Sequence, residues 1–212
     1  MIEEALNEAI EDQPKKIYGV VVGIVRNLLD PMGLGRVQVV FPWLDSEDEG
    51  PWARVAVPMA GMAHGFYFIP DIDDEVLVAF EHGDLKAPYI IGSLWNGMAP
   101  PPLPSPLAQM RMIRTPLGNQ IVFTEEPPSI VITTSDMTHT VTISSAGIQI
   151  VSDTNIINMT PDGISITGAN INLISEGNIS ISGSNVTVSG SASTSVQSAG
   201  ICSVKGSLVE IN

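Results

Sequence analysis

Short apolar strands separated by turn residues run along most of the chain, and this pattern predicts an all-β protein. Between residues 17 and 97, five or six such strands fit into about 80 residues, which suits a small closed barrel of the OB type. In the last third an alternating apolar pair, such as Ile164-Ser-Ile166, recurs at steps of seven, eight and seven residues. Because strands with one apolar face must be covered, this repeat predicts a C-terminal rod of stacked β-structure, and a triple-stranded β-helix needle of three intertwined chains is favoured over a single-chain solenoid.

The expected barrel strands are separated by turns such as Asp30-Pro-Met-Gly33 and Glu81-His-Gly-Asp84. The candidate strands are Ile17–Val25, Gly35–Phe41, Trp52–Ala56, Gly65–Ile69, Glu75–Phe80 and Tyr89–Leu94. Three further strands are expected before the regular repeat, at Met110–Arg114, Asn119–Thr124 and Ser129–Thr134.

The chain divides into four expected parts. Residues 1–16 form an N-terminal extension, and its first 13 residues have helical spacing. This segment is interpreted either as a disordered tail or as a helix that docks on a partner. Residues 17–97 form the OB-fold barrel. Residues 98–109 form a linker whose proline cluster cannot join a sheet. Residues 110–212 form the β-helix spike.

Charge and composition exclude several classes of function. Residues 1–114 carry 8 basic and 16 acidic side chains, residues 115–212 carry 1 and 7, and the net charge is −14. Binding to nucleic acid or to anionic lipid would therefore be electrostatically opposed. Cys202 is the single cysteine, so no intrachain disulfide is expected. We expect neither a signal peptide nor a membrane span, because the longest apolar run has nine residues, interrupted by glycine.

The repeat could form either a single-chain β-solenoid or a helix of three chains. No aromatic residue follows Phe123, and the apolar positions hold Ile, Val and Leu, as a narrow threefold axis would require. Pairing between chains would also remove exposed strand edges, so three chains are favoured. The expected trimer core of the needle is Ile164, Ile166, Ile171, Leu173, Ile179, Ile181, Val186 and Val188.

The sequence predicts no catalytic site, no cofactor and no metal site. The three histidines, His64, His82 and His139, lie apart and without a nucleophile motif. His139 shares strand parity with Val141 and Ile143, so three imidazoles could converge on a threefold axis. A turn histidine is the favoured interpretation.

The barrel segment contains four distinctive stretches, Asp30-Pro-Met-Gly-Leu-Gly-Arg-Val-Gln-Val, Phe41-Pro-Trp-Leu44, Pro51-Trp-Ala-Arg-Val55 and Ile91-Gly-Ser-Leu-Trp-Asn-Gly97. Through these stretches it resembles the OB domain of phage baseplate spikes, namely the baseplate assembly protein V group and the related VgrG spikes of contractile injection systems. Residues 114–124 are similar to the strand pair that opens the β-helix in that family. The family-like barrel residues are Gly35, Arg36, Val37, Phe41, Pro42, Trp43, Trp52, Ala53, Arg54, Gly92, Leu94, Trp95, Asn96 and Gly97.

The resemblance implies a structural central spike, a homotrimeric needle that caps the inner tube or hub and pierces the target envelope on sheath contraction. Its expected partners are a separate hub or tube-initiator baseplate protein at the N-terminal side and a PAAR-type tip protein at the C-terminal end. The particle would assemble in the cytoplasm, meet the target cell envelope transiently and bind no nucleic acid. Only the proline linker stands where some members insert a lysozyme domain, so no enzyme activity is expected. The alternative is a secreted single-chain β-solenoid that binds or cleaves polysaccharide.

Overall fold

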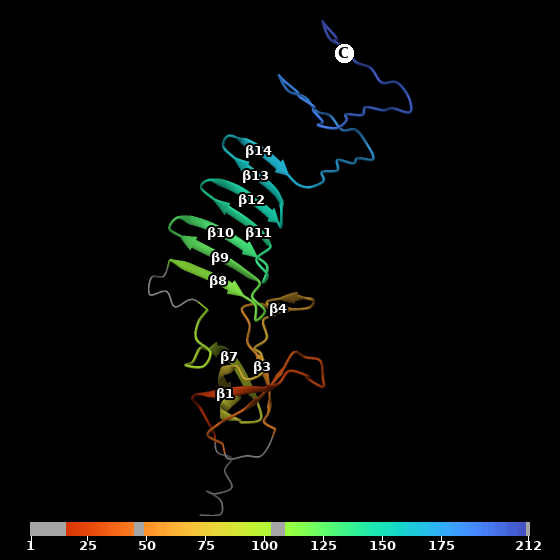
Figure 1. Cartoon of the computed structure of the whole chain (residues 1–212). Coiled ribbons are helices and arrows are strands. Elements are labelled where there is room, and N and C mark those ends of the chain that lie inside the picture. Colours follow the sequence, from red (N-terminus) through yellow and green to blue (C-terminus); the bar gives the residue numbers. More distant parts are fainter. Residues whose placement is uncertain (1–15, 45–48, 103–108, 211–212) are drawn as a thin grey trace, which may run out of the picture. The chain divides into compact units, whose positions relative to one another are not determined.

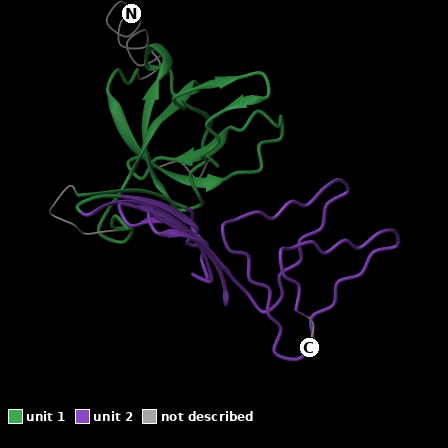
Figure 2. Cartoon of the chain, turned by 90° about the horizontal axis from the view of Figure 1, so that it is seen from above, with its two compact units in different colours: residues 1–114, 124–126 green, residues 115–123, 127–212 purple. Residues whose placement is uncertain are grey.

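The computed structural model describes residues 16–44, 49–102 and 109–210. It falls into two compact units, residues 1–114 with 124–126 and residues 115–123 with 127–212 (Figure 2). The predicted helical or disordered segment 1–13 lies outside the described residues, as do residues 103–108 of the predicted linker.

Five strands of the first unit close into a barrel in the order β1-β2-β3-β7-β6, which confirms the predicted barrel (Figure 1). The strand β3 pairs with β7 in parallel, and the other barrel pairs are antiparallel. A 3-10 turn at Glu81–Gly83 connects β6 with β7. The barrel strands are β1 (Val20–Asn27), β2 (Val37–Val40), β3 (Trp52–Val55), β6 (Glu75–Phe80) and β7 (Pro88–Leu94).

The barrel core consists of the inward residues of these strands. In β6 the buried residues alternate strictly with half-buried ones, as expected for a strand with one face in a core. Gly23 of β1 is buried, and a Cβ there would clash with Val39 of β2, so only glycine lets the two strands approach this closely. The buried apolar residues are Val25, Val37, Val39, Phe41, Ala53, Val76, Val78, Phe80 and Ile90.

Residues 56–74 connect β3 to β6 and contain a short hairpin of β4 (Ala60–Gly61) and β5 (His64–Gly65). The predicted strand Gly65–Ile69 is wrong, because Phe66–Pro70 joins no sheet. The pattern of this segment is that of a strand, but the parallel pairing of β3 with β7 closes the barrel and leaves no free edge beside it.

The strand directions give the barrel two ends. The chain enters at residues 16–19, and the connection 81–87 lies at this same entry end, where Ile17 N donates to Gly83 O. At the opposite end, the exit end, lie the connections 28–36 and 56–74 and the segment that follows β7.

Seven antiparallel strands in chain order form a second sheet, seen in Figure 1 as successive hairpins. Its first three strands are the predicted ones within two residues at each end. The strands are β8 (Met110–Arg114), β9 (Gln120–Glu125), β10 (Pro128–Thr133), β11 (His139–Ser144), β12 (Gly147–Ser152), β13 (Asn155–Thr160) and β14 (Gly163–Thr167).

The segment after β14 differs from the rest of the chain. In its described part, residues 168–210, no strand or helix forms, and every residue from 169 to 210 is exposed. Within the described ranges, no helix is long and apolar enough to cross a membrane.

Candidate functional site

Two adjacent rows of side chains on one face of the sheet β10–β14 are entirely apolar. Residues directly opposite each other in a sheet share a face, so the pairing registers align the side chains into rows across the strands. The first apolar row is Ile130, Ile143, Ile148, Met159 and Ile164. The second is Ile132, Val141, Ile150, Ile157 and Ile166. The two rows are two residues apart along each strand, so their ten side chains lie on one face, here called the apolar sheet face.

The opposite face of the same strands is largely polar. Its central row is Val131, Thr142, Gln149, Asn158 and Ser165, and the Gln149 amide donates to Asn158 Oδ1 at 2.9 Å. This contrast is the hydrophobic-in, polar-out alternation of a sheet with one buried side. Yet eight of the ten side chains on the apolar sheet face are exposed in the single chain, and Ile164 is 72% exposed.

The predicted needle-core residues fall into two groups. Ile164 and Ile166 lie on the apolar sheet face. The other six, from Ile171 to Val188, are exposed in the segment that follows β14. The role of all eight residues in a trimer core stays a prediction. The prediction omitted the eight residues of the apolar sheet face between Ile130 and Met159. The same alternation of apolar and polar residues runs through those strands and was the signal that would have found them.

His139 begins β11 on the same face as Val141, as its parity predicted. Its Nδ1 lies 3.0 Å from Ser152 Oγ on the adjacent strand. The preceding turn is held by Asp136, which accepts hydrogen bonds from the Thr134 hydroxyl at 2.6 Å and from Thr138 N. The Thr134 hydrogen bond is the main reason that the pKa of Asp136 is lowered to about 2. Among the described residues, no three His, Cys, Asp or Glu side chains come together as metal ligands would.

The family-like motif in the barrel begins with a rigid loop after β1. The Asp30 carboxylate accepts backbone hydrogen bonds from Met32, Leu34 and Arg36. It also pairs with the Arg36 guanidinium at 2.7 Å, and the Asp30 side chain is almost fully buried. These contacts, the guanidinium first, hold the pKa of Asp30 well below its usual range, and they raise the pKa of Arg36. Arg36 lies over the Trp52 ring at 5.9 Å, which ties the loop to β3.

Several of the remaining motif residues also serve the fold. Arg54 lies over the Tyr89 ring at 5.4 Å, and the Tyr89 hydroxyl donates to Glu81 at 2.6 Å, which raises the pKa of Tyr89. Asn96 donates to Glu75 at 2.7 Å and accepts from the backbone that follows it. Val37, Phe41 and Ala53 belong to the core, Gly35 adopts a positive φ of 69°, and Gly92 and Gly97 have open space around them. Pro42, Trp43 and Trp95 are exposed, and Leu94 is half-buried.

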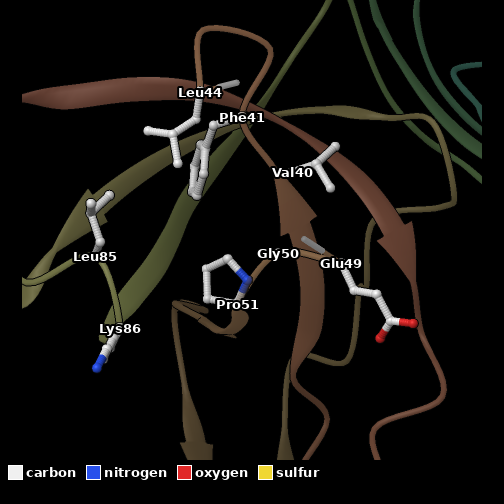
Figure 3. A pocket seen from close by; sticks show the side chains of 8 residues that line it. All are labelled: Val40, Phe41, Leu44, Glu49, Gly50, Pro51, Leu85 and Lys86. Carbon is white, nitrogen blue, oxygen red and sulfur yellow. The ribbon is translucent and has the colours of Figure 1, made fainter. Parts of the chain in front are cut away.

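A pocket opens beside β2 at the entry end of the barrel (Figure 3). Phe41, Leu44 and Leu85 give it an apolar lining, and the Lys86 amine and the Glu49 carboxylate lie at opposite sides of it (Figure 3). The complete lining is Val40, Phe41, Leu44, Glu49, Gly50, Pro51, Leu85 and Lys86.

The comparison with known proteins agrees with this barrel. Residues 21–95 match the family model described as the type VI secretion system/phage-baseplate injector OB domain. This match spans β1 to β7, and it confirms the resemblance to VgrG-type baseplate spike proteins.

Two relatives are similar to a part of this chain of comparable length. The type VI secretion system spike protein VgrG4b of Pseudomonas aeruginosa is 38% identical over 84 residues, or 37% of this chain and 10% of the relative. The actin cross-linking toxin VgrG1 of Vibrio cholerae is 38% identical over 76 residues, or 34% of this chain and 7% of the relative. The matched segment is thus a small part of each of these much longer relatives.

Proposed function

We propose that this chain is the structural central spike of a contractile injection apparatus, in which three copies form one needle. The observation that carries the proposal is the apolar sheet face, whose ten Ile, Val and Met side chains lie on one side of β10–β14. A monomer rarely leaves so large an apolar surface open to water, and surfaces of this kind mark association sites.

Three sheets that turn their apolar faces toward a common axis would bury this surface. The polar row through Gln149 and Asn158 would then face water, where its hydroxyl and amide groups are hydrated. Neither row of the apolar sheet face contains a charged residue, so three copies can approach without charge repulsion.

The distal part of the needle would follow β14. Residues 169–210 bury nothing in the single chain, although the segment repeats apolar pairs such as Ile179 and Ile181. Pairing with two other chains would give these short strands both neighbours and a core. We accordingly assign residues 17–97 to the barrel, 98–109 to the linker and 110–212 to the spike.

The proposed mechanism is transmission of force rather than catalysis. Sheath contraction would act through a hub or tube-initiator protein on the N-terminal side, and the interlocked needle would pierce the target envelope. A PAAR-type tip protein would cap the C-terminal end. The particle would assemble in the cytoplasm and be driven outward. The motif side chains of the barrel support this reading, because their contacts brace loops and strands.

The secreted single-chain β-solenoid is not favoured. Successive coils of a single-chain parallel β-helix stack with parallel strands, whereas β10–β14 pair antiparallel as successive hairpins. Native mass spectrometry of the purified full chain tests the proposal directly. We expect a trimer that resists SDS without heating, and a folded monomer at micromolar concentration would refute it.

A further inference from the structure

Three soft metal ligands lie on or beside the hairpin of β4 and β5, namely Met59, Met62 and His64. We propose that these side chains bind a soft monovalent cation of the Cu⁺ class. Thioether sulfur selects Cu⁺ and imidazole also binds it, whereas Mg²⁺ and Ca²⁺ require oxygen ligands. The site belongs to the barrel alone, so this inference does not depend on the proposed function.

The imidazole of His64 is held with one nitrogen free for a metal ion. His64 Nδ1 lies 2.9 Å from Met62 O. Because a carbonyl oxygen only accepts hydrogen bonds, Nδ1 carries the proton in this contact, and the neutral ring keeps its lone pair on Nε2. Metal-bound histidines typically have this arrangement, in which the second ring nitrogen donates to a carbonyl or a carboxylate. The Met62 carbonyl therefore orients the ring for binding through Nε2.

The strand pairing places Met59 on the same face of the hairpin as His64. Gly61 pairs with His64. The backbone N–H of Phe66 donates to Met59 O at 3.0 Å, and this pair lies two residues further along the strands, so it shares their face. The His64 ring lies on Gly61, since a Cβ there would be 2.4 Å from Nε2. Met59 is the next residue on that face beyond Gly61, so its thioether is the side-chain neighbour of the free nitrogen.

Met59 and His64 also line the same pocket, which has a volume of 520 Å³ and lies at the exit end of the barrel. None of the described residues that line it has a carboxylate side chain, and apart from His64 and Tyr67 their side chains are apolar. A hard dication would find no carboxylate ligand there. Met59 is 49% exposed, so an ion can reach the site from solvent.

Met62 supplies the third ligand from the turn of the hairpin. Its side chain is 95% exposed. The next residue, Ala63, has a positive φ of 60°, a conformation that costs energy for a residue with a Cβ and that occurs preferentially at functional sites. The unbranched methionine side chain has three rotatable bonds, so its sulfur can turn onto an ion held by Met59 and His64.

The charge balance also suits a cation. All three ligands are neutral, so a monovalent ion in this site keeps its positive charge. The chain has a net charge of −14, and a strongly acidic protein raises the local concentration of cations. The field therefore favours entry of the ion, and the soft ligands provide the selectivity.

Titration of the full chain with Ag⁺ in chloride-free buffer tests the site. Ag⁺ shares the charge and the ligand preference of Cu⁺ and keeps its oxidation state in air. The Cys202→Ser background removes an exposed thiol that would itself bind Ag⁺. With ¹³C-labelled methionine methyl groups, the NMR signals of Met59 and Met62 should shift and should saturate at equimolar Ag⁺. The signal of Met98, which is 97% exposed, should stay in place.

Substitutions of the ligands separate this site from scattered weak binding. His64→Gln should raise the Kd for Ag⁺ by at least about tenfold, since even the loss of an outer-shell partner typically costs that much. Met59→Leu should raise it as well, and because leucine has nearly the same volume, this variant decides the matter if His64→Gln disturbs the fold. Met98→Leu is the matched control and should leave the Kd unchanged.

Three results would overturn the proposal. The first is an absence of shifts at Met59 and Met62, and the second is a Kd that neither Met59→Leu nor His64→Gln changes. The third is an equally strong response to Zn²⁺, which would contradict a soft monovalent site. Native mass measured on the same samples keeps the two conclusions apart: a trimer without Ag⁺ binding leaves the spike standing, and a monomer that binds Ag⁺ leaves this site standing.

Discussion

Replacing Ile150 with aspartate tests the inward orientation of the apolar sheet face at its centre. Ile150 lies in the second apolar row, between Val141 and Ile157, and is 38% exposed in the single chain. In the proposed trimer the three copies of this side chain would approach a common axis, so the substitution would place three carboxylates in an apolar interior.

The penalty can be estimated from two contributions. Burying a whole isoleucine is worth about 1.5–3 kcal/mol, so hiding the exposed fraction of Ile150 is worth about 1 kcal/mol per chain. A carboxylate in the interface would lose several kcal/mol of hydration. It can avoid that loss by taking up a proton, which costs about 4 kcal/mol at pH 7 for a free pKa near 3.9. The total is therefore about 5 kcal/mol per chain at pH 7.

The penalty should depend on pH, and its sign follows from the raised pKa of the buried aspartate. Protonation becomes easier as the pH approaches the free pKa, so the penalty falls by about 2.7 kcal/mol per chain between pH 7 and pH 5. The Ile150→Asp trimer should accordingly dissociate at pH 7 and recover at pH 5. Ile150→Asn, which has no titratable group, should not recover.

The assay is light scattering with native mass at matched chain concentrations. Val151→Asp is the matched control, because Val151 lies on the same strand and faces the polar side. Both aspartates disturb the strand alike, so a difference between them reports the face. If Ile150→Asp stays as trimeric as Val151→Asp at pH 7, the inward assignment of this face is refuted.

Two further predictions concern the barrel. Gly23→Ala should lower the free energy of unfolding in urea by about 1–3 kcal/mol, because its Cβ would clash with Val39, whereas Gly92→Ala meets open space and should change it by less than ~0.5 kcal/mol. Equal effects of the two substitutions would contradict the packing. Asp30→Asn should lower the thermal unfolding midpoint at pH 7. The lowered pKa of Asp30 stabilises the fold fully above the unfolded-state pKa near 3.9, and this contribution is lost progressively as the pH falls from there toward the lower folded-state pKa. The difference in thermal unfolding midpoint between the parent and Asp30→Asn should therefore become smaller in acid. A difference that stays constant with pH would count against the ion pair with Arg36 as its cause.

The barrel could be predicted from the sequence because its strands carry the signal themselves. The alternation in Glu75–Phe80 and the turn residues around it set the strand and its inward face. The same reasoning failed at Gly65–Ile69, where the pattern is equally strand-like. A strand needs a neighbouring strand to pair with as well as an alternating sequence. The pairing of β3 with β7 closes the barrel and leaves no edge with which Gly65–Ile69 could pair. Pairing across 35 residues of sequence is not visible in any local window.

The C-terminal sheet was predictable in its parity but not in its extent. The alternation of apolar and polar residues predicts that Ile164 and Ile166 lie on one face of the sheet. The strand register confirms this shared face, because the two residues lie opposite Met159 and Ile157 of β13. Alternation does not predict what covers that face. Within the described chain, β14 ends the sheet and leaves one edge without a neighbouring strand. An open edge beside an uncovered apolar face is an aggregation hazard for a monomer, and a second chain removes both at once. The 42 residues from 169 to 210 extend the same argument, since all of them are exposed in the single chain, and in the proposed trimer they would gain a fold from contacts with the other chains.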